Sequence, residues 1–176
     1  MKKFFMLFCV ALLSLTASAY DYDYEPEAKG GDWAIGLNIN QGTPNPLFNL
    51  GLGGKVQFYA ARMFRLEASF NGFFKRRDVI YWDTNLNAHF VIYMKKRFSI
   101  YPLLGATIMY GKYIDRGLGF GINVGAGLQY DITENLYATL EPYYKYSSKS
   151  SLDTENQDYQ IGNSRVNISL GIAYRF

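Results

Sequence analysis

The sequence predicts an all-β protein, an eight-stranded antiparallel up-and-down transmembrane β-barrel. From Asp32 to Phe176, apolar and polar residues alternate with a period of two, which is typical of strands with two unlike faces. The alternating runs exceed the ~5–6 residues usual in soluble strands and approach the ~9–11 tilted residues that span a bilayer. Short turns also alternate with mostly longer loops along the chain, as in outer-membrane barrels.

The first 19 residues predict a signal peptide, and therefore export. Lys2 and Lys3 precede an apolar run over residues 4–13, and Ala17-Ser18-Ala19 supplies the small residues of a cleavage site. The alternative is a short membrane anchor, but the run falls below the ~20 apolar residues of a spanning helix. The one cysteine lies inside this segment, so we expect a mature chain without disulfides or thiol chemistry.

Residues 20–31, YDYDYEPEAKGG, predict an acidic periplasmic tail that precedes the barrel domain of residues 32–176. We expect a solvated spacer ending in a flexible glycine pair. A role in binding a partner stays open, because three tyrosines interleave with the acidic residues. The formal net charge of +3 is too small to indicate a nucleic-acid-binding surface.

The first four strands are expected over residues 33–40, 48–60, 64–74 and 80–93. In the first, Trp33, Ile35, Leu37 and Ile39 alternate with small or polar residues. The next two repeat this pattern, and the fourth is the longest, running from Ile80 to Tyr93. Each run therefore presents one apolar and one polar face.

The last four strands are expected over residues 98–111, 118–131, 136–146 and 165–176. The fifth contains Pro102, which suggests a bulge or a strained position. The sixth is the clearest, since its polar face is mostly glycine, and the eighth ends the chain on the aromatic Phe176. Short turns are expected near 60–63, 94–97 and 131–135, and longer loops near 41–47, 75–79, 112–117 and 147–162.

Residue size and aromatic placement predict that the apolar face contacts lipid. The polar face is rich in Gly, Ala, Ser and Asn, which suits the narrow interior of an eight-stranded barrel. Aromatic residues gather at two levels, which predicts two girdles at the bilayer boundaries. One girdle comprises Trp33, Phe58, Phe64, Phe98, Tyr130, Tyr174 and Phe176, and the other Trp82, Tyr110, Phe120, Tyr144 and Tyr146. The alternative is a secreted ligand-binding barrel with an apolar interior.

At these residues the chain resembles the small eight-stranded outer-membrane barrels of Gram-negative bacteria, the outer membrane protein A and X types. In that family the assembly machinery recognises a terminal pattern that Ser169, Gly171, Tyr174 and Phe176 fill in order. An exposed last strand can add to a sheet edge of that machinery by backbone pairing. Some relatives carry a peptidoglycan-binding domain, which the resemblance does not extend to here. It implies outer-membrane localisation and a monomer.

The inward face carries charges that must be paired inside a narrow lumen. They are Lys55, Arg65, Glu67, Asp83, Glu141, Lys145, Arg165 and Arg175. We expect a salt-bridged plug built on Lys55, Glu67, Glu141 and Arg165, with the two glutamates as central acceptors; a gated small-ion path is the alternative. His89, the one histidine, is expected to be structural, and no metal or cofactor is expected.

The predicted long loops are basic, with Lys75, Arg76, Arg77, Lys112 and Arg116. These basic residues have two open interpretations: they are solvated surface charges, or they contact the phosphates of lipopolysaccharide.

The sequence as a whole predicts a non-enzymatic outer-membrane barrel that serves envelope integrity or surface interaction with a side-chain-filled lumen. Its expected partners are outer-membrane lipids, including lipopolysaccharide, and the barrel assembly machinery. A narrow small-solute or ion pore is the alternative. A lipid A-modifying enzyme is a further one, although residues 89–91 lack the His-x-Ser spacing of the deacylases.

Overall fold

The computed structural model describes residues 28–43, 49–76, 79–94, 97–112, 116–147 and 165–176. Its strands are β1 (Trp33–Thr43), β2 (Asn49–Ala61), β3 (Phe64–Arg76), β4 (Val79–Phe90), β5 (Ile92–Tyr93), β6 (Phe98–Lys112), β7 (Arg116–Asp131), β8 (Leu136–Ser147) and β9 (Arg165–Arg175). Because β5 continues β4 after a break at Val91, the eight predicted strands are all present. Within these described residues, no helix is both long and apolar enough to cross a membrane.

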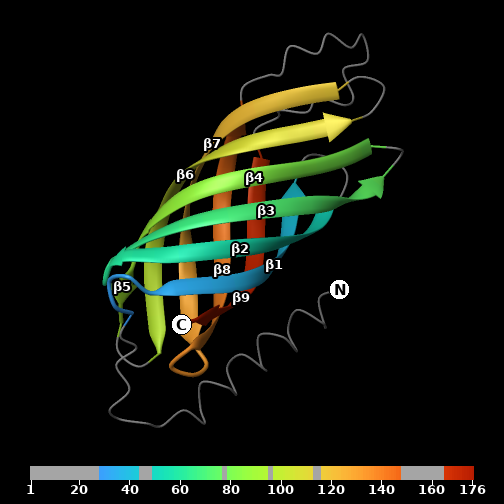
Figure 1. Cartoon of the computed structure of the whole chain (residues 1–176). Helices are drawn as coiled ribbons and strands as arrows, with labels where there is room; N and C mark the ends of the chain where they lie inside the picture. The colour runs from blue at the N-terminus through green and yellow to red at the C-terminus, as the bar shows by residue number, and fades with distance from the viewer. Residues whose placement is uncertain (1–27, 44–48, 77–78, 95–96, 113–115, 148–164) are drawn as a thin grey trace.

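The strands close into an antiparallel barrel (Figure 1). Each strand pairs with the next along the chain, and β1 pairs with β9, where Ile35 lies opposite Tyr174. Pairing of β4 with β6 joins the two ends of the strand order. Closure leaves no sheet edge in the hydrocarbon region, where unpaired backbone groups are costly. The predicted eight-stranded fold is confirmed.

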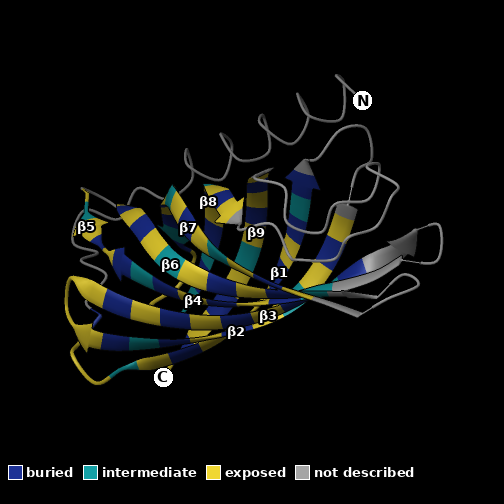
Figure 2. Ribbon diagram, turned by 90° about the horizontal axis from the view of Figure 1, so that it is seen from above, coloured by how far each residue is buried: buried dark blue, intermediate teal, exposed yellow. Residues whose placement is uncertain are grey.

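The two faces of the barrel differ in the predicted sense, as the alternating bands of buried and exposed residues show (Figure 2). Outward side chains such as Leu37, Leu86 and Leu104 are more than 60% exposed. Inward side chains such as Arg65, His89 and Lys145 are fully buried. The large apolar residues therefore form the lipid-facing surface, and the polar residues fill the lumen.

Aromatic pairs lie at both ends of the strands. At the short-turn end, the rings of Trp33 and Phe58 have centroids 4.9 Å apart, as do those of Phe98 and Tyr130. At the other end, the Trp82 ring stacks on Tyr110 at 5.0 Å. These pairs occupy the levels of the two predicted girdles.

The irregularities of the strands differ from the expectations in two respects. Pro102 causes no bulge against β7, since the β6–β7 register runs unshifted through Pro102 and Ala126. On the other side of β6 the ladder is interrupted at Pro102, between Leu103 opposite His89 and Ile100 opposite Ile92. The register shifts lie in the β2–β3 and β3–β4 pairs. Two of the predicted long connections are short, because ladders continue as far as Arg76 opposite Val79 and Lys112 opposite Arg116. The hairpins there extend as paired strands.

The residues that lead into β1 are held at the short-turn end of the barrel. The Gly31 amide donates to the Tyr59 carbonyl at 2.7 Å, and the Tyr59 amide donates to the Asp32 carbonyl at 2.9 Å. Gly31 has a φ of 101°, a conformation that glycine adopts readily. Ala28 is buried. Residues 28–31 are thus held against the barrel although Lys29, Gly30 and Gly31 are exposed, while residues 20–27 of the expected tail lie outside the described residues.

Candidate functional site: the charged lumen

The lumen holds buried charges at several levels. Among the described residues, the buried inward charges are Lys55, Arg65, Lys145 and Arg175 against Glu67, Asp83, Asp131 and Glu141. Four positive charges thus face four negative ones. Balance matters here because an unpaired charge away from water is strongly destabilising.

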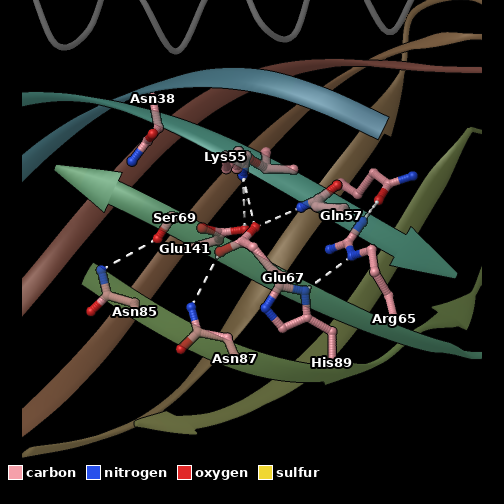
Figure 3. Close-up of polar contacts among 12 residues, drawn as sticks. Asn38, Lys55, Gln57, Arg65, Glu67, Ser69, Asn85, Asn87, His89 and Glu141 are labelled. Atoms are coloured by element: carbon pink, nitrogen blue, oxygen red, sulfur yellow. Dashed lines mark hydrogen bonds and ion pairs between the residues drawn. The ribbon is translucent and has the colours of Figure 1, made fainter. Parts of the chain in front are cut away.

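The central level is an ion-pair cluster around Lys55 of β2 (Figure 3). Lys55 Nζ lies 3.4 Å from Glu67 Oε2 of β3 and 3.3 Å from Glu141 Oε1 of β8. It also donates to Thr139 Oγ1 at 3.0 Å. Gly171 leaves room for this side chain, because a Cβ there would lie 3.0 Å from Lys55 Nζ. The structure thus brings together three of the four residues expected to form the lumen network.

The two carboxylates have further donors. Glu67 accepts hydrogen bonds from Gln57 Nε2 at 2.6 Å and Asn87 Nδ2 at 3.2 Å. Glu141 accepts one from the Tyr101 hydroxyl at 2.7 Å. The cluster is therefore a hydrogen-bonded network, which offsets part of the cost of burying its charges.

Arg65 of β3 lies below this cluster in a cage of tyrosine rings. Its guanidinium carbon is 4.6 Å from the centroid of the Tyr101 ring, 5.5 Å from Tyr59 and 5.9 Å from Tyr137. Its nitrogens donate to His89 Nδ1 at 3.0 Å, to Gln129 Oε1 at 2.7 Å and to the Tyr59 hydroxyl at 3.1 Å. Ring faces attract a cation, so the cage stabilises the Arg65 charge inside the lumen.

His89 lies between the cage and the ion pairs. Its ring stacks on Tyr101 with centroids 4.8 Å apart, and a ligand atom of each of Glu67, His89 and Glu141 lies within 4.8 Å of the others. This trio does not suit a divalent cation. The Lys55 ammonium already occupies the space beside both carboxylates. His89 Nδ1 accepts the hydrogen bond from Arg65, so the neutral ring carries its proton on Nε2 and neither nitrogen has a lone pair left for a metal. The trio fits a structural network better than a metal centre.

The upper level combines a second ion pair with asparagine amides. Lys145 Nζ of β8 lies 2.6 Å from Asp83 Oδ2 of β4 and donates to Asn85 Oδ1 at 3.0 Å. Asn71 and Asn85 both donate to Asp83 Oδ1. These bonds connect strands on different sides of the lumen, so this level too is cross-linked.

Some predicted site residues fall outside this network. Arg165 begins β9 opposite Lys145, but its side chain is outside the described part. Ser169 and Gly171 line the inward face of β9, whereas Tyr174 and Phe176 face outward.

The residues expected to contact lipopolysaccharide lie at the other end of the barrel. The expectation that Lys75, Arg76, Lys112 and Arg116 lie in loops is wrong, because the strand ladders extend through them: Lys75 and Arg76 end β3, Lys112 ends β6 and Arg116 begins β7. Their side chains, and Arg77 altogether, lie outside the described residues.

Sequence reasoning did not single out the tyrosine cage. Tyr59, Tyr101 and Tyr137 are wholly or almost wholly buried on the polar face. Tyr101 lies opposite Gly127, and a Cβ on that glycine would collide with the Tyr101 ring. The sequence did carry a signal for this cage: large aromatic residues occupy inward positions of the strands, and one of them lies opposite a glycine.

Comparisons with known proteins agree with this architecture. The family model of the outer membrane protein beta-barrel domain matches residues 7–176. The N-terminal β-barrel domain of Pseudomonas aeruginosa OprF matches with a TM-score of 0.61 at 17% identity, covering 81% of this chain and 97% of that one. Neisserial surface protein A matches with a TM-score of 0.63 at 14% identity, covering 84% and 98%.

Two further results complete the comparison. Ail of Yersinia pestis matches with a TM-score of 0.54 at 17% identity, covering 85% of this chain and 100% of that one. No curated protein matches the chain. At these identities the structural likeness shows the fold alone.

Proposed function

This chain belongs to the outer membrane protein beta-barrel domain family and lies in the outer membrane, and from this premise we propose that it is a non-enzymatic barrel with a filled lumen. It serves envelope integrity or surface interaction. The observation that carries the proposal is the buried network in which Lys55 joins Glu67 and Glu141 above the caged Arg65. Side chains packed this way across the lumen support a stable membrane scaffold whose contacts are made on its outside.

A deletion strain tests this role. Loss of the protein is expected to sensitise cells to detergents, and the wild-type chain is expected to restore resistance. A variant with residues 148–164 replaced by a short turn separates the two arms: rescue supports a role of the barrel itself, and failure despite normal membrane levels supports interaction through this connection. Unchanged detergent resistance and unchanged surface binding in the deletion strain would contradict the proposal.

A narrow pore is the second candidate, and unsatisfied polar atoms favour it. Thr107 Oγ1, Asn123 Oδ1 and Asn167 Nδ2 are buried without a hydrogen-bond partner among the described residues. Such atoms are usually satisfied by water, and a line of water could conduct. Swelling of proteoliposomes in small neutral solutes tests the pore: we expect no swelling above protein-free vesicles.

Enzymatic lipid modification is disfavoured by the setting of His89. Its described contacts are the Arg65 guanidinium and the Tyr101 ring, and neither supplies a nucleophile at the membrane boundary. Mass spectrometry of lipid A from cells with and without the protein is expected to give identical spectra.

Lipopolysaccharide is the proposed lipid partner at the outer end of the barrel. The paired backbone positions of Lys112 and Arg116, together with the end of β3, place basic residues at this end. Arginine and lysine suit phosphate oxygens. Replacing Lys75, Arg76 and Arg77 by serine is expected to reduce co-purifying lipopolysaccharide, and unchanged co-purification would refute the contact.

A further inference from the structure

The short-turn mouth of the barrel is built around Tyr59. Its backbone binds the entering chain on both sides, through Gly31 and Asp32. Gly30 also packs close to this strand end, since a Cβ there would lie 3.5 Å from the Ala60 carbonyl oxygen. Ala28, the first described residue, is 1% exposed. The chain upstream of Ala28 therefore starts at the mouth.

Two guanidiniums share the ring of Tyr59. The guanidinium carbon of Arg65 is 5.5 Å from the ring centroid, and that of Arg175 is 5.9 Å away. Arg65 Nη2 and Arg175 Nη1 are buried and have no hydrogen-bond partner among the described residues. A buried donor without a partner is destabilising, so each of these N–H groups calls for an acceptor.

The buried charges at this level are the two guanidiniums and one carboxylate. Asp131 is the buried carboxylate there; its Oδ1 accepts from Gln129 Nε2 at 3.0 Å. Gln129 in turn accepts from Arg65, so one amide separates these two charges. Asp131 Oδ2 has no hydrogen-bond partner among the described residues either, and the negative charge that balances the lumen as a whole lies at the Lys55 cluster, where two carboxylates share one ammonium.

The segment that precedes Ala28 carries the opposite charge in a regular pattern. Its four acidic residues occupy alternate positions, Asp21, Asp23, Glu25 and Glu27; Tyr22, Tyr24 and Pro26 lie between them, and Tyr20 precedes them. In an extended chain, alternate side chains point the same way. Such a chain would present four carboxylates on one side and three tyrosines on the other.

We propose that residues 20–27 dock across the short-turn mouth of the barrel in an extended form, with the acidic side turned toward Arg175. Glu27 directly precedes buried Ala28 in the sequence, so it is the acidic residue of this segment that is nearest along the chain to the described mouth. A carboxylate supplies the kind of acceptor that the unpartnered Arg175 Nη1 lacks. The occupant of this surface is therefore a segment of the chain itself.

Paramagnetic relaxation enhancement tests the docking. A nitroxide label is attached at Tyr24→Cys in a Cys9→Ser background, which leaves one thiol in the full chain, folded in phosphatidylcholine nanodiscs. The amide signals of Asn135 and Arg175 are expected to disappear when the label is oxidised and to return when it is reduced. High salt is expected to restore them as well, because ionic strength screens the attraction.

Two variants of the tail separate charge from mere proximity. Neutralising all four acids, as Asp21→Asn, Asp23→Asn, Glu25→Gln and Glu27→Gln, is expected to abolish the broadening. The matched control, Tyr20→Phe with Tyr22→Phe, keeps the charges and is expected to keep the broadening. Both leave the barrel unchanged, so the test holds even if Arg175→Gln fails to fold.

Three results would overturn the proposal. The first is a wild-type tail that broadens no signal at the mouth. The second is broadening that survives neutralisation, which would assign any contact to the tyrosines. The third is loss of broadening on adding phosphatidylglycerol together with a shift of the Arg175 signals, which would make anionic lipid headgroups the occupant.

Discussion

Replacing Lys55 by methionine removes the cation at the centre of the lumen while keeping most of its side-chain volume. Glu67 and Glu141 then face each other without a shared partner. Oxygens of the two carboxylates lie within 4.8 Å of each other, so their repulsion amounts to about 3.5 kcal/mol at an effective dielectric constant of about 20. Breaking a buried pair typically costs about 3–5 kcal/mol. We therefore expect Lys55→Met to lower the free energy of unfolding by about 3–5 kcal/mol.

The matched control removes the charges together. In the triple variant Lys55→Met/Glu67→Gln/Glu141→Gln, no buried charge is left unpaired. We expect its free energy of unfolding to lie within about 1 kcal/mol of the wild type, because neutral replacement of a buried ion pair is often tolerated.

Urea titration in lipid vesicles measures both variants, with the folded fraction read from the mobility of unboiled samples on gels. The reasoning is refuted if Lys55→Met costs less than about 1 kcal/mol, or if the triple variant is as unstable as the single one. Either result would mean that the contacts of Lys55 with the two carboxylates contribute little to stability.

Two further predictions concern glycine packing and chain closure. Gly127→Ala drives a Cβ into the Tyr101 ring and is expected to lower the free energy of unfolding by about 1–3 kcal/mol. In the control Gly72→Ala the new Cβ meets no atom within 4 Å, so we expect a change of less than about 0.5 kcal/mol. Equal urea midpoints for the two variants would contradict this. Phe176→Ala is expected to lower the amount of heat-modifiable protein in outer membranes, while Phe120→Ala on the lipid face is not. Equal amounts of both variants would show that the terminal aromatic is dispensable for assembly.

The period-two pattern was enough to predict the strands and their faces. It places Lys55, Glu67 and Glu141 on the inward side because each lies an even number of residues from the other polar-face residues of its strand. The same parity argument applies to His89, which is buried as expected.

Partners across the lumen could not be predicted, because they depend on register and on barrel width. In the β2–β3 ladder, Lys55 lies opposite Ser69, while Glu67 lies opposite Gln57, so the ion pair is diagonal. Glu141 belongs to β8, a strand that does not pair with β2. Their contact exists only because closure brings opposite walls within side-chain reach. The cage around Arg65 depends on the same closure.

Single-channel recording in planar bilayers tests the central claim most directly, namely that side chains fill and seal the lumen. The wild-type barrel, shown to be folded by its gel mobility before boiling, is expected to give no discrete current steps. Regular steps that scale with salt concentration would contradict the account, because they would require a continuous path past Lys55 and the Arg65 cage.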